Sequence, residues 1–288
     1  MNNPGMSRRE FHIRITPRDA GRRPAQLLAE ASGLSQAAVK DAMHKGAGWL
    51  TRGAHTRRLR RQKTLLREGD ELHLYHDPQV LAQQAPQAQL LVDEGDYSVW
   101  VKPAGMRSQG SKWGDHTTLT RWCELHLEPQ RPAFLVHRLD RAASGLMLVA
   151  HGKSMARQLA ALFEQRQVAK RYRVLVEGKF PLRPLERVFD TPLDEKPSRS
   201  SAQRLAFDAA SGRSLLEVQI ETGRKHQIRR HLACAGFPVV GDRLYGGKAW
   251  DEDLRLAAVS LSFMQPGSGE PKTYELPPQS LAWGDWPA

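Results

Sequence analysis

The segment Phe134–Ala150 places a carboxylate between two apolar runs. Residues 137–141 read HRLDR, so Asp140 has arginines close by in the sequence. A carboxylate at the end of a strand is held rigidly and can face a cleft, and neighbouring cations favour its ionised form at neutral pH. Such a group could serve acid–base or electrostatic catalysis. A structural aspartate in a turn, salt-bridged to Arg138 or Arg141, would explain the same local pattern.

Taken from the residues alone, two later side chains give only a weak signal for such chemistry. Tyr172 begins the apolar run 172–176, and Arg229 lies in a basic segment. Each also has a simpler interpretation. A tyrosine in an apolar strand is often a core residue with a solvated hydroxyl, and Arg229 and Arg230 could contact phosphates.

The chain offers few candidate metal ligands. His226 and His231 are the nearest pair, with Cys234 close by, but their neighbours are basic or amide residues and the next carboxylate is Asp242. The only other cysteine, Cys123, is distant, which argues against a CxxC zinc site or a disulfide framework. We therefore expect no metal site at these residues.

From Leu90 onward the chain alternates strand-like and helical runs. Probable strands cover 98–102, 172–176 and 214–220, and apolar residues recur at helical spacing over 154–165. Strands outnumber helices, without regular βαβ alternation. We therefore predict an α+β domain with a mixed, mainly antiparallel sheet flanked by helices.

The preceding residues indicate a smaller α+β module. Residues 23–31 form one candidate helix, and Ser35 can cap a second that runs to Gly46. Strand-like residues follow at 49–51 and 72–75. The resulting division is a flexible N-terminus (1–10), a small module (11–76), a linker rich in Gln, Ala and Pro (77–89), and a large domain (90–288).

Charge points to a polyanionic partner. The net charge is +12, and residues 1–75 contain 15 Lys and Arg against 7 Asp and Glu. Such an excess favours RNA or DNA. We expect five cations of one basic run to contact phosphates, although a solvated loop would look the same: Arg57, Arg58, Arg60, Arg61 and Lys63.

Composition limits the classes of protein to which this chain can belong. The hydrophobic fraction of 40% is enough for a buried core. No apolar run approaches the roughly 20 residues of a membrane span, and residues 1–10 lack the apolar core of a signal peptide. With two distant cysteines, we expect a cytoplasmic protein without a membrane partner. No heptad pattern stands out, so we expect a monomer.

Four ordered segments resemble the RluA family of RNA pseudouridine synthases. HRLDRAASGLMLVA (137–150) is similar to the catalytic motif of that family. AKRYRVLVEG (169–178) is similar to its tyrosine motif, and TGRKHQIRRHLACAGFPVVGDRLYGG (222–247) to its arginine motif. VWVKPAGM (99–106) resembles the opening strand and turn of its catalytic domain. The layout of the basic module resembles the S4-like RNA-binding domain.

The resemblance implies the pseudouridine synthase fold and isomerisation of a uridine in RNA without cofactor or metal. It implies that Asp140 is the catalytic aspartate, that Tyr172 stacks against the target base, and that Arg229 pairs with Asp140. Arg138 matches an arginine that fills the space vacated by the flipped uridine. We expect this arginine and four neighbours to bind substrate: His137, Arg224, His226 and Gln227.

Two departures from the family pattern stand near these residues. Ala142-Ala143 replaces a family Asp-Thr, and Ala257 replaces a family histidine. Neither touches the Asp, Tyr and Arg set, so we expect activity to survive. Structured RNA is the expected substrate, with 23S ribosomal RNA favoured by the S4-like module and transfer RNA second. The main alternative is an inactive RNA-binding or ribosome-associated protein, while a glycosidase would need a second well-placed carboxylate.

Overall fold

The computed structural model describes residues 7–247 and 249–281. It divides into two compact units, Met1–Ala85 with Gln109–Trp122, and Pro86–Ser108 with Cys123–Ala288. The division expected from the sequence was contiguous, with one large domain from residue 90. The structure differs because 109–122 packs with the first unit, where Trp113 meets the ring of Tyr75 and Asp115 pairs with Arg58.

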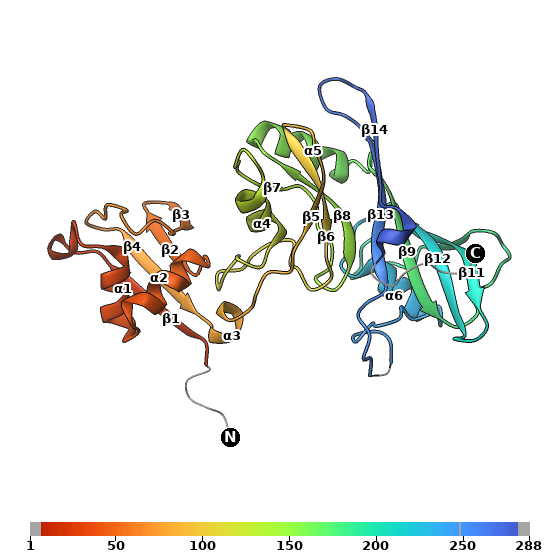
Figure 1. Cartoon of the computed structure of the whole chain (residues 1–288), viewed down its shortest axis with the longest axis horizontal. Helices are drawn as coiled ribbons and strands as arrows, with labels where there is room; N and C mark the ends of the chain where they lie inside the picture. The colour runs from red at the N-terminus through yellow and green to blue at the C-terminus, as the bar shows by residue number, and fades with distance from the viewer. Residues whose placement is uncertain (1–6, 248, 282–288) are drawn as a thin grey trace. The chain divides into compact units, whose positions relative to one another are not determined.

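The first unit is a four-stranded antiparallel sheet in the order β1–β4–β2–β3, with two main helices (Figure 1). Its strands are β1 (Arg9–Arg14), β2 (Gly48–Arg52), β3 (His55–Arg58) and β4 (Glu71–His76). Its helices are α1 (Pro24–Ser32), α2 (Gln36–His44), the short α3 (Pro78–Leu81) and the 3-10 turn η2 (Pro17–Asp19).

Local signals set these helices as the sequence suggests. Pro24 opens α1, and Gly33 ends it in the left-handed conformation with φ 70°. The Ser35 side chain accepts the backbone N–H of Ala38 at the start of α2. The apolar faces of both helices meet the sheet in one core, whose fully buried members include Leu28, Val39, Met43, Leu50, Leu72 and Leu74.

Both segments expected to be irregular contain regular structure. β1 starts at Arg9, inside the stretch expected to be flexible, whose residues 1–6 lie outside the described chain. In the expected linker, Asp77 caps α3 by accepting the N–H of Val80, and it also accepts from Arg8 at 2.5 Å. Leu81 packs into the core of the first unit. Capping and burial therefore order part of this segment.

The second unit is built on a ten-stranded sheet. The main order is β10–β11–β12–β9–β13–β8–β6–β5, with β14 beside β13 and β7 beside β8. Its strands are β5 (Gln89–Asp93), β6 (Tyr97–Lys102), β7 (Phe134–Leu135), β8 (Ser144–Ala150), β9 (Ala169–Glu177), β10 (Arg187–Phe189), β11 (Ser200–Asp208), β12 (Arg213–Ile220), β13 (Leu256–Met264) and β14 (Pro271–Glu275). Among the described strand pairs β8 and β13 alone are parallel, which confirms the mixed, mainly antiparallel sheet.

The remaining helices are few, and one of them covers the expected helical run. They are α4 (Leu119–His126), α5 (Lys153–Glu164), α6 (Gln227–Cys234) and the 3-10 turn η3 (Pro278–Ser280). Leu159 of α5 packs into the core of the second unit with Tyr97, Leu148 and Val259. No described helix is long and apolar enough to cross a membrane.

A glycine controls the close approach of β8 and β13. Gly145 pairs with Ala258 and has φ 108°, and a Cβ there would collide with the Ala258 backbone. Glycine is the residue that tolerates both demands. The start of β8 is thereby fixed against the centre of the sheet, five residues after Asp140.

Candidate active site

Asp140 lies in the connection between β7 and β8, and backbone contacts hold this connection in place. The Ser108 hydroxyl donates to the carbonyl of Leu139 at 2.8 Å and accepts its N–H at 3.1 Å. The N–H of Ala143 donates to the carbonyl of Asp140 at 3.2 Å. The Asp140 side chain remains 20% exposed, so it is fixed yet accessible.

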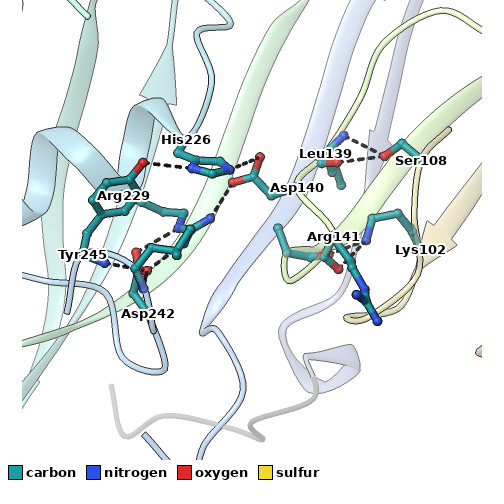
Figure 2. Close-up of polar contacts among 11 residues, drawn as sticks. Lys102, Ser108, Leu139, Asp140, Arg141, His226, Arg229, Asp242 and Tyr245 are labelled. Atoms are coloured by element: carbon teal, nitrogen blue, oxygen red, sulfur yellow. Dashed lines mark hydrogen bonds and ion pairs between the residues drawn. The ribbon is translucent and has the colours of Figure 1, made fainter. Parts of the chain in front are cut away.

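Arg229, on α6, bridges two carboxylates (Figure 2). Its Nε and Nη2 donate to both oxygens of Asp242 at 2.8 and 2.7 Å, and its Nη1 donates to Asp140 Oδ2 at 3.2 Å. Burial alone would lower the pKa of Arg229, but the bonds and charge of Asp242 raise it. A two-point fork to Asp242 leaves one edge of the guanidinium aimed at Asp140.

Asp242 is itself buried and fully engaged. Its Oδ1 also accepts the backbone N–H groups of Leu244 and Tyr245 at 3.0 and 3.1 Å. Burial acts to raise the pKa of Asp242, but the bonds and charge of Arg229, together with the two backbone N–H bonds, lower that pKa overall. Asp242 therefore stays a carboxylate and fixes the position of Arg229.

A second set of contacts reaches Asp140 from His226. His226 Nε2 lies 3.8 Å from Asp140 Oδ1, and its Nδ1 lies 3.0 Å from the Tyr245 hydroxyl (Figure 2). The Tyr245 ring also lies under Arg229, with 5.2 Å between Cζ and the ring centre. Burial lowers the pKa of His226, although the charge of Asp140 acts to raise it. His226 has φ 54°, a conformation uncommon for a non-glycine residue.

Tyr172 comes from β9, which is separated from β8 by β13 in the sheet, and it is buried. Burial, and then the charge of Asp140, raise the pKa of its hydroxyl well above the usual value. It is therefore a neutral phenol in the physiological range. Tyr172, Asp140 and Arg229 line one cavity of about 190 Å³.

The other predicted substrate-binding residues fall into three groups. Arg138 is exposed and lines this cavity, as does Arg224, whose Nε donates to the Pro197 carbonyl. His137 lines an adjacent cavity. Gln227 is buried, and its amide is occupied, because it accepts from Thr222 and Arg224 and donates to Arg199 and Ser200. The geometry gives Gln227 a bracing role rather than a free binding group.

Lys102 is a site residue that the sequence analysis did not single out. At the end of β6, its Nζ donates to the carbonyls of Ala143 at 2.6 Å, Pro103 and Met106 at 3.0 Å, and Arg141 at 3.4 Å. Two of these carbonyls, those of Arg141 and Ala143, lie within the connection that carries Asp140; Figure 2 shows Lys102 beside Arg141. The signal was present in VWVKPAGM, a lysine at the end of an apolar strand, but that pattern does not reveal the four acceptors.

Burial lowers the pKa of Lys102 to about 7, against an ordinary value of 10.5, and Asp140 opposes this shift. Between these pH values the unfolded chain holds a proton that the folded chain releases, so this group makes the fold more stable as pH rises. We expect the unfolding free energy of wild type relative to Lys102→Met to increase from pH 7 to 10, by up to about 1.4 kcal/mol per pH unit. Urea unfolding at three pH values measures this. A difference that stays flat or falls with pH would contradict it.

The basic run of the first unit divides in two. Arg58 Nε pairs with Asp115 at 2.9 Å, and its guanidinium lies over the Trp49 ring; Arg60 also pairs with Asp115. Arg57, Arg61 and Lys63 are exposed, and no ion pair to them is recorded among the described residues. The five expected phosphate contacts are therefore not equivalent, because the single carboxylate of Asp115, distant in sequence, pairs with both Arg58 and Arg60.

Within residues 7–247 and 249–281, no three His, Cys, Asp or Glu side chains are grouped as metal ligands would be. His226 contacts Asp140 and Tyr245 instead, and His231 bonds Ser198 and Ser200. Both histidines that were considered as metal ligands therefore have protein partners in the described structure.

Comparisons with known proteins show to which family this chain belongs, with its fold and its pocket lined by Asp140, Tyr172 and Arg229. The family model described as RNA pseudouridylate synthase matches residues 96–234. The solved structure of human RNA pseudouridylate synthase domain containing 4 superposes with a TM-score of 0.54 at 24% identity, covering 66% of this chain and 88% of that one. At that identity the likeness shows the fold.

Sequence relatives extend the match beyond the fold. An uncharacterised RNA pseudouridine synthase of Aquifex aeolicus is 29% identical over 76% of this chain and 79% of its own length. The dual-specificity RNA pseudouridine synthase RluA of Vibrio parahaemolyticus is 32% identical over 62% of this chain and 78% of its own length. The chain belongs to the RNA pseudouridine synthase family, whose members are isomerases.

Proposed function

We propose that this protein isomerises uridines in structured RNA and that Asp140 is its catalytic residue. The observation that carries the proposal is the Arg229–Asp140 contact of 3.2 Å beside Tyr172 in one pocket. The reaction breaks the glycosidic bond, turns the base and rejoins it to the sugar through carbon. It needs a carboxylate near the sugar or base, a charge partner for it, and a pocket for a base removed from its stack.

Each residue has a separate proposed role. Asp140 acts on the reacting nucleotide by attack on the sugar, attack on the base, or proton abstraction from the sugar, all of which require the same carboxylate. Arg229 orients that carboxylate. Tyr172, a neutral phenol, stacks against the target base, and Arg138 takes the space that the uridine leaves in the RNA.

Ribosomal RNA is the favoured substrate, with transfer RNA second. The support is the basic first unit, whose layout resembles an S4-like domain and which we propose binds structured RNA. The Vibrio parahaemolyticus relative is described as dual-specificity, and we therefore keep transfer RNA as a second candidate substrate. A reduced cytoplasmic location and a monomeric state remain predictions from the sequence.

Three exposed cations beside a basic hollow are the expected phosphate contacts. Arg57, Arg61 and Lys63 line a cavity of about 800 Å³ together with Arg52 and Arg67. Changing the three to glutamine should weaken RNA binding and reduce the slope of log affinity against log salt by about 0.7 to 0.9 per lost contact. Filter binding at four salt concentrations measures both quantities.

The matched control removes three exposed cations of the second unit: Lys153, Arg157 and Arg183. It should leave the affinity and slope near wild type. An Arg58→Gln, Arg60→Gln variant should instead lower stability, because Asp115 loses its partners. If the first variant binds RNA with unchanged affinity and slope, the proposed contact surface is wrong.

Tritium release from RNA labelled at uridine C5 tests the function directly. Wild type would be incubated with separate ribosomal and transfer RNA pools that lack the modification. Release establishes the reaction, and the active pool names the substrate class. If the protein binds RNA but releases no tritium from either naked RNA pool or from precursor ribosomal particles, the alternative of an inactive RNA-binding protein is favoured.

A further inference from the structure

A second cavity adjoins the catalytic pocket. It has a volume of about 470 Å³ and shares Arg138, Tyr172 and Arg224 with that pocket. Lys170 also lines it, two residues before Tyr172 in β9. Residues two apart in a strand project from the same face, so this strand presents Tyr172 and Lys170 side by side to the two cavities.

One part of this cavity is aromatic. The rings of His137 and Phe163, which both line it, stack with 4.3 Å between centres and 17° between planes. His137 Nε2 accepts the N–H of Leu148 at 2.9 Å, which places the ring proton on Nδ1. Burial, and then the charge of Lys170, lower the pKa of His137 to about 3. The site therefore offers a neutral, flat surface of the kind on which nucleic-acid bases stack.

The rest of the lining is mainly cationic. Arg138, Arg166, Lys170 and Arg224 line the cavity, and no ion pair to a carboxylate is recorded for any of them among the described residues. Two carboxylates are present, but Glu221 pairs with Arg199 at 2.8 Å and Glu164 is exposed at the end of α5. Four unneutralised cations beside an aromatic surface match a nucleotide, which has an anionic phosphate and a flat base.

Lys170 is the most informative of these cations. It is only partly exposed, and burial, followed by the nearby charge of Arg166, lowers its pKa. A partly buried ammonium without a counterion is costly in the free protein, and an anion would remove much of that cost. A phosphate is the anion that an RNA substrate brings to this position.

We propose that this second cavity binds the nucleotide next to the target uridine in the RNA strand, with its base against the His137–Phe163 pair and its phosphate at Lys170. The inference rests on the proposed function and deepens it. The reacting uridine would occupy the pocket of Asp140, and its neighbour the adjoining cavity beyond Tyr172. Recognition would then extend beyond the uridine itself.

Arg166 adds an independent feature. It follows the C-terminus of α5 with φ 60°, where glycine is the favoured residue, yet the position carries an arginine that lines the cavity. An Arg166→Gly change relieves backbone strain and removes a cation. If Arg166 serves only the fold, the change should leave the melting temperature unchanged or raise it, and KM should stay at the wild-type value. If it binds RNA, the change should raise the melting temperature and also raise KM.

The test uses the RNA transcript that gives tritium release with wild type. Lys170→Met should raise KM at least fivefold, more than it lowers kcat, and should reduce the salt slope by about 0.7 to 0.9, which corresponds to one lost phosphate contact. Lys170→Arg should recover most of the affinity. Lys153→Met, a lysine at the far end of α5, should match wild type.

Abasic substitutions on either side of the target uridine test the base contact. At one of the two positions wild type should lose fivefold or more in kcat/KM, and Phe163→Ala should lose little further. Full release with unchanged KM and salt slope in Lys170→Met, or equal tolerance of both abasic RNAs, would overturn this proposal while leaving the isomerase function intact. Absence of release with wild type would instead reject the function itself.

Discussion

Asp140→Asn is expected to reduce pseudouridine formation by about 10³-fold or more while RNA binding stays within a few-fold of wild type. The change keeps the shape of the side chain but removes the charge and the basic oxygen that the reaction requires. Arg229 would still be held, because Asp242 supplies two of its three acceptor bonds. The loss should therefore appear in turnover rather than in folding.

Tritium release and filter binding on the same RNA separate these two effects. Asp96→Asn, an exposed aspartate elsewhere in the second unit, is the matched control and should behave as wild type. Turnover by Asp140→Asn close to wild type would remove this residue from the catalytic role. A parallel loss of binding and thermal stability would mean that the substitution disturbs the fold.

Asp242→Ala is expected to cause the largest loss of stability. Arg229 is 5% exposed and Asp242 is fully buried, so the change leaves a buried guanidinium without its main counterion. Breaking a buried pair in this way costs about 3–5 kcal/mol of unfolding free energy. Activity should fall as well, because Arg229 loses the fork that aims it at Asp140.

A double-mutant cycle with Arg229→Met isolates the pair. Removing both charges should cost clearly less than the sum of the single changes, since no unpaired charge then remains buried. Asp251→Ala, an exposed aspartate, provides the control for urea unfolding. Additive losses in the cycle would show that the two side chains do not stabilise each other.

Local patterns predicted the secondary structure well where one physical signal dominated. Pro24 and Gly33 bound α1, Ser35 caps α2, and the apolar spacing over 154–165 corresponds to α5 at Lys153–Glu164. The excess of strands without βαβ alternation correctly predicted the mainly antiparallel sheet. Boundaries were less certain where buried caps such as Asp77 ordered a stretch whose composition is that of a linker.

The basic run shows where such reasoning ends. Arg57, Arg58, Arg60 and Arg61 are equivalent as a sequence pattern, but Arg58 and Arg60 turn towards Asp115, more than fifty residues later. Charge is additive along a sequence, whereas neutralisation depends on which carboxylate the fold brings close. Composition can therefore predict a basic module without distinguishing its free cations from its paired ones.

The candidate site also has features that the sequence predicts and features that only the tertiary structure shows. The residues themselves established a basic chain, an aspartate between two apolar runs, and a tyrosine and an arginine in later segments, because residue type and spacing are properties of the sequence. Only the tertiary structure decided that Asp242 holds Arg229, that Lys102 binds the carbonyls around Asp140, and that Lys170 lies beside a cavity next to Tyr172. These contacts join segments far apart in the chain, and their energies depend on burial and distance, which arise only when the sheet is assembled.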